Sequence, residues 1–216
     1  MSDVNRPSEA SPTTPSVPRV RRPTREAVRH RLLAAALDVF AESGFANASL
    51  DQVAAAAGLT KGAIYSNFES KDDLFFAMMT DQVLNRVETI RTALAANAAD
   101  TQGQQTLHDV GRLLTEAITE QRKWQLVFLD FWRRAVGDES VRLQFVVHRR
   151  ALRDAIADRV SQILQGAPPP DELTVDDVVT VVLALSNGLA IEQYTDPTTV
   201  SDDLFGRVLA RLSLQS

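Results

Sequence analysis

The sequence contains no cysteine, which removes several kinds of chemistry at once. Disulfides, thiolate metal ligands and cysteine nucleophiles are all excluded. Only three histidines are present and they are scattered, so we expect no metal site and no cofactor. Glycine-rich phosphate loops and the G-x-S-x-G pattern of hydrolases are also missing. We therefore expect a protein that is not an enzyme.

Long hydrophobic stretches are missing as well. No apolar run has the length needed to cross a bilayer, and the N-terminus lacks the hydrophobic region of a signal peptide. We therefore expect no membrane contact and a cytoplasmic location. The 216 residues allow one large domain or two small ones, and the apolar fraction is enough for a real core.

The chain has little positive charge overall, and its formal net charge is −5. That charge is unevenly divided. Residues 1–71 carry nine Lys and Arg against seven Asp and Glu, whereas residues 72–216 carry fourteen against twenty-one. A local basic patch matters more for phosphate binding than the overall sign, so the first third of the chain is the better candidate for contact with nucleic acid.

Residues 1–23 are rich in Pro, Ser and Thr and nearly free of apolar residues, which predicts a disordered segment in the free protein. The segment ends in a basic arm that includes Arg22 and leads to Arg25. Such an arm can lie in the minor groove of DNA, where narrow A·T tracts attract arginine. A solvated tail without a function is the alternative.

The stretch from Ser49 to Phe68 predicts two short helices separated by a tight turn. Ser49 with Gln52 three residues later is a capping box, and Thr60 offers a second N-terminal cap. Gly58 stands where the first helix must end, because a positive φ suits glycine best. This is a helix-turn-helix pattern, although an ordinary helical hairpin would produce the same signals.

The flanking residues favour the first interpretation. A helix over Thr24–Ser43 precedes the pattern, and Ser70 with Asp73 opens a long helix after it. The segments L-L-A-A-A-L-D-V-F-A-E-S-G-F, A-G-L-T-K-G-A-I-Y-S-N-F and S-K-D-D-L-F together resemble the TetR/AcrR family of bacterial transcriptional regulators. The resemblance is strong over residues 26–86. It implies an all-α protein with a helix-turn-helix domain over 24–70 and an effector-binding and dimerisation domain over 71–216.

The second helix of the pattern, from Lys61 to Asn67, is the one expected to enter the major groove. Lys61 suits guanine or phosphate, and Tyr65 suits phosphate. Ala63 suits a thymine methyl group, and Asn67 suits adenine or phosphate. The family often has an aromatic residue and a histidine after the tyrosine, whereas this chain has Ser66 and Asn67, which puts the target sequence in doubt. The predicted DNA-binding residues are Arg22, Arg25, Ser49, Thr60, Lys61, Gly62, Ala63, Tyr65, Ser66, Asn67 and Lys71.

The second half of the chain contains further amphipathic helices, including one over 138–165. By the family resemblance they surround an effector pocket, although an aromatic stripe of this kind equally fits plain core. His148, Arg149 and Arg150 are interpreted as solvated. The predicted pocket residues are Met78, His108, Phe128, Phe131, Trp132, Phe145 and Asn187.

The last two long helices form the dimer interface in the family. Here they correspond to Val178–Tyr194 and Asp203–Leu212, and the first is apolar nearly all round, so that it must be covered on both sides. The predicted interface residues are Val178, Val182, Leu204, Phe205, Val208 and Leu212. The resemblance implies a homodimeric repressor of a palindromic DNA operator, released by a hydrophobic or amphipathic effector. A ligand-independent architectural protein that coats double-stranded DNA is the alternative.

Overall fold

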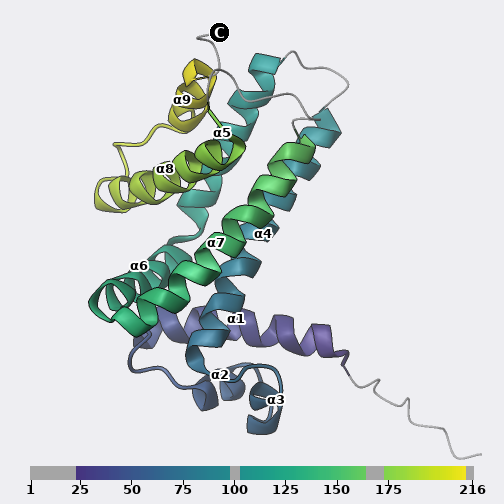
Figure 1. The fold of residues 1–216 in the computed structure, drawn as a ribbon, viewed down its shortest axis with the longest axis vertical. Helices are drawn as coiled ribbons and strands as arrows, with labels where there is room; N and C mark the ends of the chain where they lie inside the picture. The colour runs from purple at the N-terminus through teal and green to yellow at the C-terminus, as the bar shows by residue number, and fades with distance from the viewer. Residues whose placement is uncertain (1–22, 98–102, 164–172, 213–216) are drawn as a thin grey trace, which may run out of the picture.

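The structure, a computed structural model, describes residues 23–97, 103–163 and 173–212, and every element in these ranges is an α-helix (Figure 1). The prediction of an all-α fold is therefore confirmed. The predicted N-terminal arm lies outside the described residues except for Pro23. The helices are α1 (Arg25–Ser43), α2 (Leu50–Ala56), α3 (Lys61–Tyr65), α4 (Lys71–Asn97), α5 (Gly103–Glu120), α6 (Arg122–Gly137), α7 (Glu139–Ile163), α8 (Val175–Thr195) and α9 (Leu204–Leu212).

Local capping explains where the first helices begin and end. The Thr24 hydroxyl accepts a hydrogen bond from the backbone N–H of Ala27, and Ser49 forms the predicted capping box with Gln52. The Thr60 hydroxyl accepts from the N–H of Ala63 at the start of α3. Gly58 has φ of 62°, a conformation that side chains with a Cβ atom rarely adopt. The caps predicted from the sequence are confirmed.

The helix-turn-helix forms one end of an elongated molecule, and α4 connects it to the rest (Figure 1). Helix α4 begins beside α1 and continues away from α2 and α3, with α7 packed along it. Helices α5, α8 and α9 lie at the opposite end, and α6 lies between the two ends and packs against α1, α7 and α8. A single helix, α4, thus belongs to both parts of the molecule.

Aromatic side chains form the core nearest the helix-turn-helix. The Phe131 ring stacks on Phe75 with ring centroids 3.7 Å apart and meets Phe45 and Phe76 edge-on at 5.0 and 5.3 Å. Such arrangements add to the free energy gained by burial. We call this group the aromatic core; its members are Phe40, Phe45, Phe75, Phe76, Trp124, Phe128 and Phe131. It joins α1, α4 and α6 across the predicted domain boundary at residue 70.

A second, smaller cluster holds the opposite end together. We call it the distal core; its members are Ile90, Leu114, Ile118, Ala190 and Phe205. Helices α5 and α9 approach each other closely at Gly111 and Gly206, and a Cβ atom on Gly111 would lie only 2.0 Å from the Cα atom of Gly206. Glycine is therefore required at position 111 for α9 to pack against α5.

Candidate functional site

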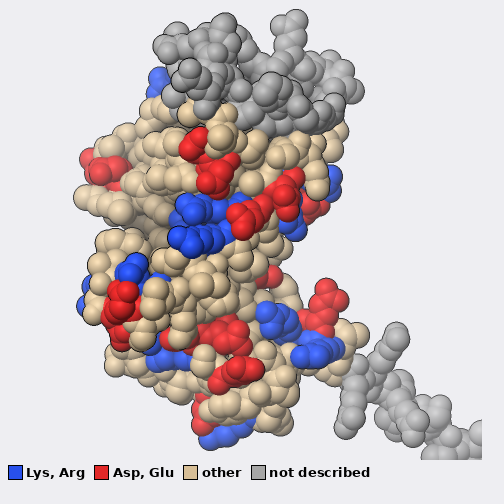
Figure 2. Space-filling model, viewed as in Figure 1, with Lys and Arg blue, Asp and Glu red and all other residues tan. Residues whose placement is uncertain are grey.

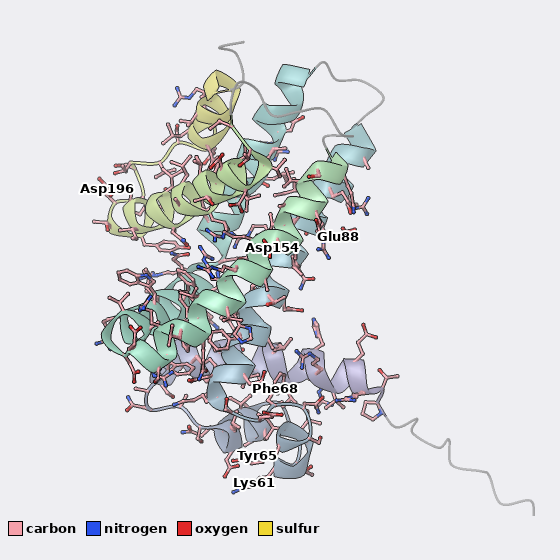
Figure 3. The ribbon with its side chains drawn as sticks, in the orientation of Figure 1. Lys61, Tyr65, Phe68, Glu88, Asp154 and Asp196 are labelled. Carbon is pink, nitrogen blue, oxygen red and sulfur yellow. The ribbon has the colours of Figure 1, made fainter. Side chains whose placement is uncertain are left out.

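Helix α3 presents a polar edge to solvent at the outer end of the molecule. Tyr65 is 56% exposed, and Lys61 and Ser66 are also exposed. Ile64 and Phe68 lie on the opposite side and are buried in the hydrophobic cluster that includes the aromatic core. Figure 3 places Lys61 and Tyr65 beyond Phe68, at the tip of the helix-turn-helix. This edge has the orientation that contact with a DNA groove requires.

The cation on this edge is held by a neighbouring carboxylate. Lys61 Nζ lies 2.5 Å from Asp51 Oδ2, which projects from the first turn of α2. The hydrogen bond from Lys61 to Asp51 raises the pKa of the lysine above its ordinary value. Lys61 therefore stays charged, but a phosphate must compete with Asp51 for it. Both side chains remain substantially exposed, so the competition takes place in water.

Several other predicted contact residues first serve the local structure. Ser49 and Thr60 cap α2 and α3, and the Ser66 hydroxyl and the Asn67 amide donate hydrogen bonds of 2.9 and 2.8 Å to the carbonyl oxygen of Ala63. The side-chain oxygen of Asn67 accepts no hydrogen bond within the described chain. A Cβ on Gly62 would meet only ordinary contact at 3.9 Å, so internal packing does not require glycine there.

Lys71 does not have the free ammonium group that a phosphate ligand needs. Its Nζ donates to the carbonyl oxygens of Phe45, Ala46 and Ala48 at 2.6, 3.0 and 2.8 Å. These bonds use all three N–H donors of the ammonium group. Partial burial also lowers the pKa of Lys71. The interpretation of Lys71 as a phosphate contact is therefore wrong: the side chain fastens α4 to the loop between α1 and α2.

The arginines of α1 differ in how they are held. Arg25 is exposed at the start of the helix, whereas the Arg31 guanidinium donates to the carbonyl oxygen of Ala57 at 2.6 Å and fixes α1 to the end of α2. The guanidinium of Arg29 lies over the Phe68 ring at 4.7 Å. Arg22 lies outside the described residues. Arg25 thus remains available for DNA contact.

Helix α6 contacts the helix-turn-helix domain through polar side chains that the sequence did not single out. The Asp130 carboxylate accepts a hydrogen bond of 2.8 Å from the backbone N–H of Phe45. Arg134 forms two hydrogen bonds with Asp72, at 2.7 and 3.1 Å, and its guanidinium lies 5.2 Å from the centre of the Phe45 ring. Bidentate pairs of this kind fix direction as well as distance.

A cavity lies between the aromatic core and the distal core. It has a free volume of about 30 Å³, which is room for two or three water molecules. The cavity is partly open to solvent and combines apolar with polar walls. Its lining residues are Val83, Arg86, Ile118, Gln121, Trp124, Gln125, Phe128, Arg149, Leu183, Ser186, Asn187 and Tyr194.

Of the predicted pocket residues, Phe128 and Asn187 line this cavity. Met78 and Phe131 are fully buried in the core, Phe145 packs against that core, and Trp132 is 47% exposed. These four residues do not line the cavity, because their sides of the helices face the core or solvent. His108 belongs to α5, but its side chain lies outside the described part of the chain.

The predicted dimer residues also divide. Phe205 is fully buried in the distal core of its own chain and cannot face a partner, so this prediction is wrong. Val182 packs against the same core, and Val178, Leu204 and Val208 are half-buried. The side chain of Leu212 lies outside the described residues. The close approach of α5 and α9 explains the correction, since the side of α9 that carries Phe205 packs against α5.

Sequence reasoning missed Arg86 and Arg149, and the interpretation of Arg149 as solvated is wrong because it lines the cavity. A signal was present in the helical periodicity. Arg149 stands four residues after Phe145 and three before Leu152, on the apolar stripe of α7. Arg86 likewise lies three residues after Val83 and four before Ile90. A basic residue on an apolar stripe indicates a side chain that is directed inward.

Comparison with protein families matches both parts of the chain. Residues 32–78 match bacterial regulatory proteins of the tetR family, and residues 103–212 match the C-terminal domain of BetI-type transcriptional repressors. Among the described residues, no helix is long and apolar enough to cross a membrane, and no group of three or more acidic residues or histidines could hold a metal.

Individual relatives agree with these matches. The transcriptional activator FasR of Mycolicibacterium smegmatis is 30% identical over 64% of this chain and 61% of its own length. The transcriptional repressor AcnR of Corynebacterium diphtheriae is 25% identical over 74% of this chain and 77% of its own. The structure of FadR from Bacillus subtilis in complex with stearoyl-CoA has the same fold, with a TM-score of 0.62, 13% identity and coverage of 86% and 97%. The relatives named here by sequence are regulators of transcription and not enzymes.

Proposed function

Because this chain belongs to the TetR family of bacterial regulatory proteins, and is therefore a DNA-binding regulator of transcription, we propose that it is a homodimeric repressor released from a palindromic operator by a small molecule. The observation that carries the DNA-binding part is the exposed edge of α3. Lys61 and Tyr65 project from it, while Ile64 on the opposite face anchors the helix. Lys61 and Tyr65 contact phosphates in this proposal, and Ala63 and Asn67 contact bases.

A dimer has a physical purpose here, because α3 is only five residues long and one copy touches too few bases to specify a site. Two copies related by a two-fold axis present their α3 helices to successive major grooves, about 34–36 Å apart. Helix α8 offers a surface for such pairing. Its exposed apolar and small residues fall on one face, at Val181, Ala184, Gly188 and Ile191.

Charges on that face test the dimer. We expect Val181→Glu combined with Ile191→Glu to yield folded monomers whose operator affinity is at least about tenfold weaker, because each half-site must then be bound separately. Sedimentation velocity measures the mass and circular dichroism the helix content. Val147→Glu on α7, at a residue that is 65% exposed, is the matched control. An intact dimer in the α8 double variant would show that the interface lies on another surface.

The cavity supports the effector part of the proposal. Helix α6 supplies Trp124, Gln125 and Phe128 to the cavity wall. Farther along the same helix, Asp130 accepts a hydrogen bond from the backbone N–H of Phe45, and Arg134 binds Asp72 at the start of α4. In this proposal, a molecule larger than the free volume pushes the walls apart and displaces α6 or α4. The FadR structure holds stearoyl-CoA, so a relative of this fold accommodates a small molecule. Couplings of about 1–3 kcal/mol, or roughly 5- to 150-fold in affinity, are typical.

The main experiment is selection of binding sites from random duplex DNA with the full-length protein at physiological salt. We expect enrichment of a palindrome with two half-sites. Tyr65→Ala and Lys61→Ala should weaken binding to that palindrome while the dimer and its helix content remain. Retention of DNA without sequence preference, with a steep dependence on salt, would instead favour an architectural protein. Failure to retain any DNA would contradict the proposal.

A further inference from the structure

The cavity between the two cores contains positive charge that nothing in the described chain balances. Arg86 and Arg149 both line it. The Arg86 guanidinium donates to the neutral side-chain oxygen of Gln121, and its Nε is buried without a hydrogen-bond partner. The Arg149 guanidinium lies 5.4 Å from the centre of the Phe128 ring. Within the described ranges neither guanidinium forms an ion pair with a carboxylate.

Several other arginines of the described chain are paired with carboxylates, and others, such as Arg31 and Arg122, are not. Carboxylate partners bind Arg91, Arg112, Arg134, Arg142 and Arg207. Most of those pairs are exposed, and there water solvates the guanidinium and the ion pair adds little stability. The two cavity arginines are half-buried, where an unbalanced charge costs most.

The surroundings of Arg149 add to this imbalance. Burial lowers the pKa of Arg149, and the nearby charge of Arg153 lowers it further. Arg153 lies one turn later on α7, and its Nε is also buried without a partner. Burial lowers the pKa of Arg86 as well. Figure 2 shows basic atoms gathered at mid-height of the viewed face, between the two ends of the molecule. An anion in the cavity would relieve these costs.

We infer that the effector is a compact organic carboxylate, whose anionic group binds Arg86 and Arg149 and whose apolar body lies against Trp124 and Phe128. This inference rests on the proposed function, since it names the chemical class of the effector. Planar, forked guanidinium groups match a carboxylate in geometry as well as charge. Aromatic and aliphatic walls, including Val83 and Leu183, favour an apolar body over a sugar.

The intrinsic fluorescence of the protein can report on this site directly. The chain has two tryptophans: Trp124 lines the cavity and is 5% exposed, whereas Trp132 is 47% exposed outside it. Trp132→Phe therefore leaves one tryptophan, in the cavity wall. The probes are phenylacetate and octanoate, each titrated against its neutral amide, phenylacetamide or octanamide. We expect at least one acid to change the Trp124 emission and to bind about tenfold or more tightly than its amide, as charged hydrogen bonds predict.

Four variants in the Trp132→Phe background locate the anion. We expect Arg149→Gln and Arg86→Gln each to weaken the acid about tenfold or more and to leave the amide unchanged. Arg150→Gln removes the same charge from the next residue of α7, which is exposed, and should change acid binding less than about twofold. Arg149→Lys keeps the positive charge but loses the planar guanidinium that can form two parallel hydrogen bonds, and it should retain part of the affinity. Circular dichroism of each variant establishes that it is folded.

The inference is overturned if acid and amide bind equally, if no acid binds at millimolar concentration, or if Arg150→Gln weakens acid binding as much as Arg149→Gln does. These titrations contain no DNA. A negative titration would therefore reject the carboxylate effector without bearing on operator binding. A negative operator selection would reject the proposed function without changing the titration result.

Discussion

The aromatic core and the distal core hold the two ends of this protein by different means. The aromatic core contains seven packed aromatic rings from α1, α4 and α6 and from the loop between α1 and α2. The distal core has one buried phenylalanine and depends on a glycine contact between α5 and α9. The cavity lies where the two cores meet. Its walls include Trp124 and Phe128 of the aromatic core and Ile118 of the distal core.

Polar contacts differ between the regions in the same way. Around the aromatic core the charged groups that join elements have partners: Lys71 binds three carbonyl groups, and Arg134 binds Asp72. At the cavity, Arg86 and Arg149 have no carboxylate partner within the described residues. A half-buried charge without a partner carries a desolvation cost that a bound counter-ion would offset.

Phe131→Ala should break the aromatic core and have the largest effect. Phe131 is fully buried with four other phenylalanine rings around it, so its removal should lower the free energy of unfolding by about 3–5 kcal/mol. Urea unfolding followed by circular dichroism at fixed protein concentration measures the change. Trp132→Ala, at the exposed neighbouring position, should cost less than about 1 kcal/mol. Similar costs for both would show that these rings do not act as one core.

Gly111→Ala should break the distal core with a somewhat smaller effect. The new Cβ would collide with Gly206, and overpacking of this kind costs about 1–3 kcal/mol. We expect a lower thermal midpoint and retained operator binding at low temperature, since the aromatic core is untouched. Gly137→Ala at the end of α6 is the control, because a Cβ there meets no atom within 4 Å. If operator binding were lost at low temperature while sedimentation velocity still showed a dimer, the two cores would not be independent.

Arg134→Gln tests the polar contacts beside the aromatic core, because it removes the contact of α6 with Asp72 and Phe45. The pair with Asp72 is partly exposed, so its loss should lower the free energy of unfolding by only about 1 kcal/mol. The larger consequence should be regulatory: a carboxylate that fills the cavity should then weaken operator binding less. Fluorescence anisotropy of labelled operator with and without that carboxylate measures this. Arg133→Gln, whose side chain is 78% exposed, should leave the response intact.

Asp51→Asn should have the smallest effect and act only at the DNA surface. Without its carboxylate partner, Lys61 is free for phosphate, so operator affinity should rise about threefold at low salt and its salt dependence should steepen. Anisotropy titrations at several salt concentrations measure both quantities. Glu69→Gln removes an equal charge from an exposed residue outside this ion pair. Equal increases in both variants would mean that net charge, and not the release of Lys61, is responsible.

The sequence was sufficient for the helix-turn-helix. Its helices begin at hydroxyl caps and turn at Gly58, and these interactions join residues three or four positions apart. The exposure of Tyr65 and the burial of Ile64 follow from helical periodicity. Because these interactions join residues that are close in sequence, both the fold of this segment and its exposed edge could be predicted.

Only the tertiary structure decided the roles of Lys71, Phe205 and Arg149. Lys71 binds carbonyl groups 23–26 residues away, Phe205 is buried because α9 packs against α5, and Arg149 faces a cavity whose walls come from helices across half the chain. Helical periodicity predicts which face of a helix is buried, but it does not predict which other element packs against that face. The sequence by itself therefore determined the helices and the exposed edge of α3, whereas contacts between distant residues decided where the cavity lies and which side chains line it.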